Sequence, residues 1–181
     1  MFSHRTLGLS LVVAALGFAV IQLVPYGHSR TNPPDGALAA FDSPATQKMA
    51  ERACYDCHSN HTQWPWYASL APISWRIQRH VDEGREKLNF TAFDAGNEKM
   101  ADAAGEASES ITKGDMPPAD FLLLHPEARL SASEKAALAK GLDVTFAAFA
   151  EKGEGGGKGD AGEKGEKAEA GEPGEKGADR D

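Results

Sequence analysis

Cys54-Tyr55-Asp56-Cys57-His58 is the stretch that decides how this chain folds, and it has the pattern C-x-x-C-H. That pattern is the attachment signature of a covalent c-type haem. Two thiols at this spacing can each add to one vinyl group at a porphyrin edge, and the histidine that follows is carried under the iron. The chain has only two cysteines, both of them here, so none remains for a disulfide. The sequence therefore predicts one haem c held by Cys54 and Cys57, with His58 as the proximal iron ligand.

Two other uses of this stretch compete with haem attachment. Thiol–disulfide oxidoreductases also carry C-x-x-C, with an exposed thiolate of low pKa, but they place it in a βαβ setting that this sequence does not indicate. Zinc could take Cys54, Cys57, His58 and His61 as four ligands. Structural zinc sites usually draw their ligand pairs from separated segments, because that is how the metal ties a fold together. Four ligands so close in sequence would tie almost nothing, and haem is preferred.

An uncharged apolar run precedes this stretch. Residues 7–24 contain no formal charge, and as a helix they would be roughly 27 Å long, enough for a bilayer core. No small-x-small cleavage site follows the run, so we expect an uncleaved anchor over residues 1–25 rather than a signal peptide. Arg5 and Arg30 flank the run and do not decide its orientation. Haem attachment takes place outside the cytoplasm, which predicts an inner-membrane anchor with the rest of the chain in the periplasm.

Helix start and stop signals divide the remainder of the chain. Residues 26–42 hold Asn32-Pro33-Pro34 and predict a short tether. Ser43 before Pro44 is typical of a helix start, Gly114 of a helix end, and Ser131 with Glu134 of a capping box. These signals predict helices over about 43–53, 72–87, 97–113 and 131–150. The result is an all-α domain of about four helices around one haem, covering residues 43–150.

The apolar spacing predicts which side of each helix faces inward. The expected inward side chains, helix by helix, are Ala45, Met49, Ala50 and Ala53; Ile73, Trp75, Ile77 and Val81; Met100, Ala104, Ala107 and Ile111; and Leu138, Leu142, Phe146 and Phe149.

Met116 is the expected sixth ligand of the iron. It stands in Gly114-Asp115-Met116-Pro117-Pro118, where the two prolines stiffen the backbone that presents the thioether. Most methionines simply fill cores, which is the competing interpretation. His125 and His80 are the rival ligands, because bis-histidine haems are also common.

Four further residues are candidates for contact with the haem. Trp64 and Trp66, within Trp64-Pro65-Trp66-Tyr67, are expected to form a wall of the haem crevice, or a small apolar cluster under the loop. Arg76 and Arg85 are expected to pair with the haem propionates, because an arginine fork suits a carboxylate. The alternative for both arginines is a solvated helix face with acidic neighbours.

Charge and composition limit the partners. The formal net charge is −8, which argues against a nucleic-acid binder because such a protein would show a basic face.

Residues 151–181 carry glycine in a triplet period that breaks at Ala168, a collagen-like pattern too short and too poor in proline for a stable triple helix. Composition predicts a disordered tail. The oligomeric state and the redox partner proteins are not indicated.

The motifs together resemble the bacterial haem-binding domain family, whose members are small, anchored, cytochrome-c-like proteins. The resemblance covers about residues 20–147. It is carried by the following strings: Asn32-Pro33-Pro34, Cys54-Tyr55-Asp56-Cys57-His58-Ser59-Asn60, Trp64-Pro65-Trp66-Tyr67, Ala71-Pro72-Ile73-Ser74-Trp75, Gly84-Arg85, Leu88-Asn89-Phe90, Met116-Pro117 and His125-Pro126. It implies covalent haem at Cys54, Cys57 and His58, with Met116 in the position of a distal ligand.

The expected function is one-electron transfer by a membrane-anchored periplasmic cytochrome. No acid–base or nucleophile constellation stands out, so an electron carrier is preferred to an enzyme. The alternative is a haem-based sensor or small peroxidase with an exchangeable sixth ligand, suggested by the histidines at positions 61, 80 and 125. A third hypothesis is a scaffold whose tail binds another envelope component.

Overall fold

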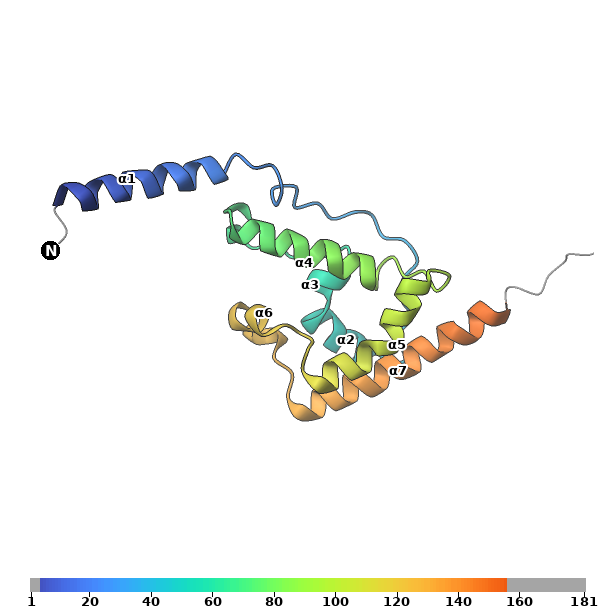
Figure 1. Ribbon diagram of the computed structural model, residues 1–181. Helices are drawn as coiled ribbons and strands as arrows, with labels where there is room; N and C mark the ends of the chain where they lie inside the picture. Colours follow the sequence, from blue (N-terminus) through green and yellow to red (C-terminus); the bar gives the residue numbers. More distant parts are fainter. Residues whose placement is uncertain (1–3, 156–181) are drawn as a thin grey trace, which may run out of the picture.

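The computed structural model describes residues 4–155, with side chains described as far as residue 149 (Figure 1). These residues form helices and connecting loops, without a strand among them. The helices are α1 (His4–Ile21), α2 (Pro44–Ala53), α3 (Tyr55–His58), η1 (Trp66–Ser69), α4 (Ile73–Lys87), α5 (Glu98–Lys113), α6 (Ala119–Leu124), η2 (Pro126–Ala128) and α7 (Ala132–Gly155), of which η1 and η2 are 3₁₀ helices. The all-α prediction is confirmed, and the four expected helices correspond to α2, α4, α5 and α7.

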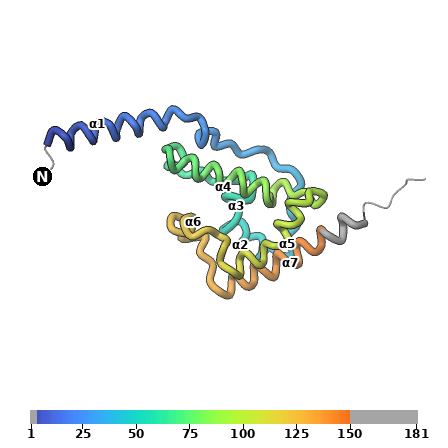
Figure 2. The backbone as a smooth tube through the Cα atoms, viewed as in Figure 1, coloured from blue at the N-terminus to red at the C-terminus, as the bar shows by residue number. Residues whose placement is uncertain are grey.

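Helix α1 extends away from the other helices (Figures 1 and 2). It has 18 residues, none of them buried, and its length and apolar composition would allow it to cross a membrane. A signal sequence near an N-terminus has the same properties. The segment after it, by contrast, lies on the domain: Gly36 N–H donates to Thr91 O at 2.8 Å and Ala39 N–H to Phe90 O at 2.8 Å.

Helix α2 begins as predicted, but one of its inward positions differs. The Ser43 hydroxyl caps the helix by accepting from the Thr46 N–H at 3.2 Å, with Pro44 in the first turn. Ala50 and Ala53 are buried, whereas Ala45 is exposed and Thr46 is buried in its place. The reason is the crossing of α2 and α7, where a Cβ on Gly141 would lie 2.2 Å from Thr46 Oγ1. The missing side chain leaves room for Thr46.

Helix α4 buries a different face from the one its apolar residues predicted. Its buried residues are Ser74, Gln78, Val81 and Gly84. Of the expected set only Val81 is buried, while Ile73 is exposed and Trp75 and Ile77 are half-buried. The cause lies outside the helix, because the tether and α3 press on its small and polar side. The Ser29 hydroxyl, for example, donates to Gln78 Oε1 at 3.1 Å.

Helices α5 and α7 supply most of the core, as their spacing predicted. Asn97 caps α5 by accepting from the Met100 N–H, and Gly114 ends it with a left-handed φ of 83°. The core of the two helices contains Met100, Ala104, Ile111, Leu138, Leu142 and Phe146, with Ala107 and Phe149 half-buried against it. Each such large apolar side chain contributes about 1.5–3 kcal/mol when buried. Helix α7 continues to Gly155, beyond the predicted end near residue 150, and the rest of the predicted tail lies outside the described residues.

Candidate haem site

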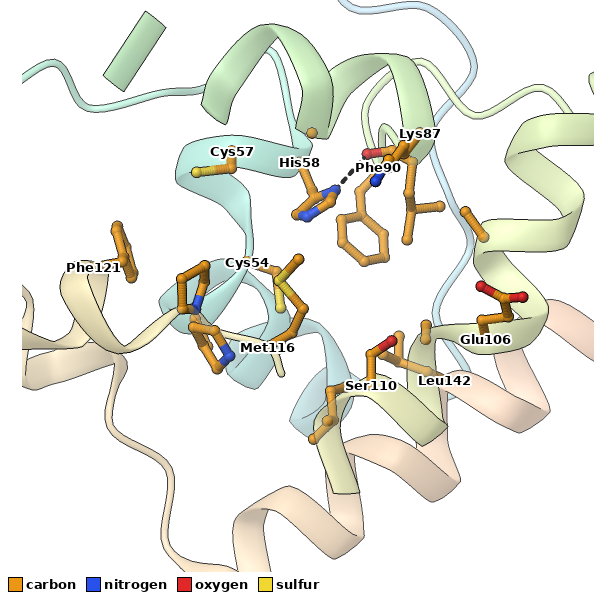
Figure 3. Close-up of a pocket in the computed structure, with 18 of the residues that line it drawn as sticks. Cys54, Cys57, His58, Lys87, Phe90, Glu106, Ser110, Met116, Phe121 and Leu142 are labelled. Atoms are coloured by element: carbon orange, nitrogen blue, oxygen red, sulfur yellow. Dashed lines mark hydrogen bonds between the residues drawn. The ribbon is translucent and has the colours of Figure 1, made fainter. Parts of the chain in front are cut away.

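A cavity of about 320 Å³ lies in the middle of the domain, enclosed by residues from α2 to α7 (Figure 3). Cys54, Cys57, His58 and Met116 all line it. The other lining side chains are mostly apolar and include Leu88, Phe90, Ala107, Ile111, Phe121, Leu130, Leu138 and Leu142. A concave, largely apolar site with a few convergent polar groups is the usual form of a cofactor pocket.

The two thiols stand at the junction of α2 and α3. Helix α2 ends at Ala53, and Cys54, with a φ of −124°, turns the chain so that α3 can begin at Tyr55. The His58 N–H donates to Cys54 O at 2.9 Å, which closes this single turn and keeps Cys54, Cys57 and His58 together. The local fold thus delivers all three motif residues to one wall of the cavity.

Burial raises the pKa of the Cys54 thiol to about 12 and that of the Cys57 thiol to about 11. Thiol–disulfide oxidoreductases need the opposite, a thiolate of low pKa at neutral pH. The zinc alternative also lacks support, because His61 turns to Asp35 at 3.0 Å. Among the described residues no group of three or more histidine, cysteine and acidic side chains gathers in a way that could hold a metal ion.

The imidazole of His58 is oriented by a hydrogen bond to the backbone of the α4 end. Its Nδ1 lies 2.9 Å from Leu88 O, and a carbonyl can only accept, so the proton is on Nδ1. Burial lowers the pKa of His58 and favours the neutral ring. Nε2 therefore keeps a free lone pair, and an Nδ1–H bond to a backbone carbonyl is the usual support of a metal-binding imidazole. The ring and the two thiols fit a haem attached to this wall.

Gly84 lets α4 come close behind the motif. A Cβ at Gly84 would lie 2.4 Å from Cys57 O and 3.0 Å from Cys57 C, both backbone atoms that cannot move aside. Only glycine allows this approach of helix to backbone. The close approach also places Leu88, whose carbonyl holds His58, one turn further along the chain.

Met116 lies in the loop between α5 and α6 and also lines the cavity. Figure 3 shows His58 and Met116 on two sides of the same space, with the Met116 side chain extending toward the histidine. The N–H groups of Asp115 and Met116 both donate to Ser110 O, at 3.0 and 3.2 Å. Met116 remains 40% exposed. The thioether of Met116 thus borders the same cavity as His58, and its role as an iron ligand stays a prediction.

The rival histidines differ in position. His80 lines the cavity from α4. His125 is outside the lining, because its ring stacks on Phe121 with the ring centroids 4.0 Å apart and its Nδ1 lies 2.9 Å from Phe121 O.

The aromatic and arginine candidates do not line the cavity. Trp64 Nε1 donates to Asn32 Oδ1 at 3.1 Å, and Trp66 is 78% exposed. Arg76 pairs with Asp120 at 2.7 Å. Arg85 donates to Ser59 O at 2.8 Å and also binds Thr31, Asn32 and Thr62, so it joins the tether to the loop after α3. Their contact with haem stays a prediction.

Glu83 and Lys87 also line the cavity and were not predicted as site residues. Together with His80 and Gly84 they form one side of α4 that faces the cavity. Their spacing of three and four residues marks one side of a helix, and this was the available signal. Glu106 and Ser110 of α5 line the cavity with the same spacing. A solvated face was one of the two interpretations of this polar side of α4, and Glu83 on it borders the cavity.

Comparison with known proteins identifies a family. A family model described as a haem-binding domain matches residues 16–143, which is more than half of the chain. No curated protein and no solved structure matches the chain significantly.

Proposed function

Because the chain belongs to the haem-binding domain family, we propose that it is a membrane-anchored periplasmic c-type cytochrome that carries single electrons on one covalent haem. One observation carries the proposal. Two thiols, an imidazole with its Nδ1 already bonded, and a thioether from another loop all border a single apolar cavity.

Different residues of the cavity would hold different parts of the haem. Cys54 and Cys57 attach it through thioether bonds, and His58 offers Nε2 to the iron while the Leu88 carbonyl keeps the ring in place. Met116 would supply a second ligand to the iron. A bound haem of this kind supplies a one-electron iron couple, and a methionine ligand raises its reduction potential. The apolar side chains around the site keep water away from the iron, which acts in the same direction.

The location is part of the proposal. Helix α1 anchors the chain in the inner membrane, and residues 43–150 form the haem domain on the periplasmic side, where c-type haem is attached. The redox partners are proteins of that compartment or of the membrane itself.

The first test is an absorption spectrum of protein made together with haem-attachment machinery. Haem that stays with the polypeptide after denaturation and acid extraction supports attachment at Cys54 and Cys57. Loss of all haem on extraction would contradict it. Cys54→Ala and Cys57→Ala are each expected to leave a single thioether bond, and the double variant none.

The second test removes the sulfur of Met116. Met116→Leu changes little volume but takes away the ligand, so the ferric spectrum should lose its far-red sulfur-to-iron band and the reduction potential should fall. Met100→Leu is the matched control, because Met100 is buried in the core and does not line the cavity. An unchanged spectrum in Met116→Leu would refute ligation by this residue.

A sensor or small peroxidase is the second candidate function. Two observations favour it: Met116 is partly exposed on a loop, and His80 also lines the cavity. An exchangeable sixth position would show as ready binding of carbon monoxide by the reduced wild-type protein. A saturated iron would bind it only in Met116→Leu.

A further inference from the structure

Several large apolar side chains of the domain are exposed, and the proposed function uses none of them. Trp66 of η1 is 78% exposed and Leu123 of α6 is 72% exposed. Leu70, Ile73 and Leu124 are exposed beside them, and we call these five residues the apolar rim. In Figure 1, η1, the beginning of α4 and α6 all lie on the left of the domain, the side toward which α1 extends.

The rim begins where α1 ends. Gln22, just after α1, uses both ends of its amide on one residue: Nε2 donates to Ala71 O at 3.1 Å, and the Ala71 N–H donates to Oε1 at 3.0 Å. Ala71 lies between Leu70 and Ile73 of the rim. Because a side-chain amide matches both polar groups of that backbone unit, α1 is attached to the domain in a defined way.

A second contact strengthens this junction. Gly27 has a left-handed φ of 85°, and a Cβ there would lie 2.8 Å from the backbone carbon of Ser74. The chain after α1 therefore lies directly on the backbone of α4. The Tyr26 hydroxyl also lies 3.5 Å from Asp82 Oδ2, further along the same helix.

Helix α6 is tied to the same end of α4. Arg76 in the first turns of α4 donates from Nε to Asp120 Oδ2 of α6 at 2.8 Å. This ion pair links α6, which carries Leu123 and Leu124, to the beginning of α4. The rim is thus one side of the domain rather than a scatter of single exposed residues, which alone would need no explanation.

The side chains next to the rim are of the types that are common at a membrane boundary. Tyr26, Trp75, Arg76 and Arg79 line a shallow hollow between the end of α1 and α4. Tyrosine and tryptophan prefer the headgroup level, where an apolar ring meets water, and arginine reaches from apolar surface to polar groups there. Such residues next to large exposed leucines suit the boundary of a bilayer better than bulk water.

We propose that the apolar rim lies in the headgroup boundary of the bilayer that takes α1, so that the domain rests on the membrane surface. This inference rests on the proposed anchor. It has a consequence for the haem site, because Cys57 and Phe121 lie at the end of the cavity next to α6 (Figure 3). The end of the cavity next to α6 is then held at the membrane. A redox partner that exchanges electrons at this end would present its redox group at the bilayer surface.

Photocrosslinking to lipid tests this placement. The full chain is reconstituted into vesicles of phosphatidylcholine and phosphatidylglycerol, with Trp66→benzoylphenylalanine or Leu123→benzoylphenylalanine, and lipid adducts are measured by mass spectrometry after irradiation. Both rim positions are expected to give adducts. Val144→benzoylphenylalanine is the matched control, because Val144 is an exposed apolar residue of α7 outside the rim, and it should give far fewer.

A probe in α1 distinguishes a wrong anchor from a wrong placement of the rim. Leu11→benzoylphenylalanine, within α1, reports whether that helix is in lipid. Adducts at Leu11 without adducts at Trp66 and Leu123 would overturn the rim alone, and no adducts at any of the three would overturn the anchor as well. Crosslinked dimers through Trp66 or Leu123 would show that a second copy covers the rim, which also overturns the proposal.

A charge in the rim provides an independent measurement. Leu124→Asp should reduce the yield of lipid adducts at Leu123 several-fold, because a carboxylate is unfavourable in the apolar boundary. Val144→Asp should leave that yield unchanged. Equal yields in the two variants would contradict the inference, and the haem absorption of each variant shows that it is folded.

Discussion

The two walls of the cavity are built in different ways. The His58 wall, residues 54–60 with 84–91, is crosslinked by many short hydrogen bonds. Examples are Phe90 N–H to His58 O at 2.8 Å, Asn60 N–H to Thr91 Oγ1 at 2.7 Å and Asn89 Nδ2 to Asn60 Oδ1 at 2.9 Å. The Met116 wall, residues 114–118, is held mainly by backbone N–H groups that donate to the last carbonyls of α5, Ser110 O and Ile111 O.

The difference teaches where the site is rigid and where it can adjust. A buried polar network resists distortion, because breaking any bond leaves a buried group without a partner. A partly exposed loop held by a few backbone bonds to one helix end can move at low cost. Under the proposed function, the His58 wall would set where the haem is held, and the Met116 wall could tune or release the sixth ligand without unfolding the domain.

The largest expected effect comes from comparing two aromatic residues, one in the His58 wall and one on the Met116 side of the cavity. Phe90 is buried and packs against Phe41, Tyr55 and Phe146, so Phe90→Ala should lower the free energy of unfolding by about 3–5 kcal/mol. Phe121→Ala, on the Met116 side, should cost clearly less because Phe121 is only half-buried. Denaturant unfolding of both variants measures this, and equal losses would break the distinction between the walls.

A methyl group behind the motif should have the next largest effect. Gly84→Ala forces a Cβ to within 2.4 Å of Cys57 O, so α4 must shift away from α3. Overpacking of this kind costs about 1–3 kcal/mol and should also lower the yield of attached haem. Gly105→Ala in α5 is the control, since its Cβ meets nothing within 4 Å; it should stabilise the helix by about 0.5–1 kcal/mol. Similar behaviour of the two variants would contradict the tight approach.

The smallest effects are expected at the capping box of α7, which belongs to neither wall and serves as a baseline. The Ser131 hydroxyl accepts from the Glu134 N–H at 3.2 Å, and the Ser131 N–H donates to Glu134 Oε2 at 2.7 Å. Ser131→Ala should lower the free energy of unfolding by about 1 kcal/mol. The haem spectrum should not change, and a change would show that the baseline is coupled to the site.

Glu134 gives the same box a dependence on pH. Its bonds to Arg52 and to Ser131 lower the pKa of this carboxyl from 4.5 to about 2. A lowered pKa means that the stabilisation is complete above the ordinary value and is lost as pH falls from about 4.5 toward about 2. Thermal unfolding across this range should show a steeper loss in the wild type than in Glu134→Gln. An identical decline in both proteins would remove Glu134 as its source.

Local chemistry explains what the sequence could predict. Ser43, Gly114 and Ser131 mark helix ends because a cap needs only its own turn, and the stripes of α5 and α7 are read within one helix. Cys54, Cys57 and His58 share the cavity wall because they lie in one turn. Met116 shares the cavity as well, although its place there depends on the whole loop between α5 and α6.

Contacts from distant segments explain what the sequence could not predict. Thr46 is buried instead of Ala45 because Gly141 leaves space for it, nearly a hundred residues away in the chain. Ser74 and Gln78 are buried because the tether lies on them. The apolar periodicity of α4 cannot predict this burial. Arg85 turns to Ser59 and Asn32 rather than into the cavity for the same reason.

The crossing of α2 and α7 at Thr46 and Gly141 also sets an order of events. A chain is made from its N-terminus, so residues 54–58 exist well before residues 132–155 do. Until α7 arrives, α2 has nothing to cross, and the wall formed by Leu138 and Leu142 is missing. The cavity that Cys54 and Cys57 line is therefore incomplete during that interval. Under the proposed function, α7 would be the last described helix to close around a haem attached there.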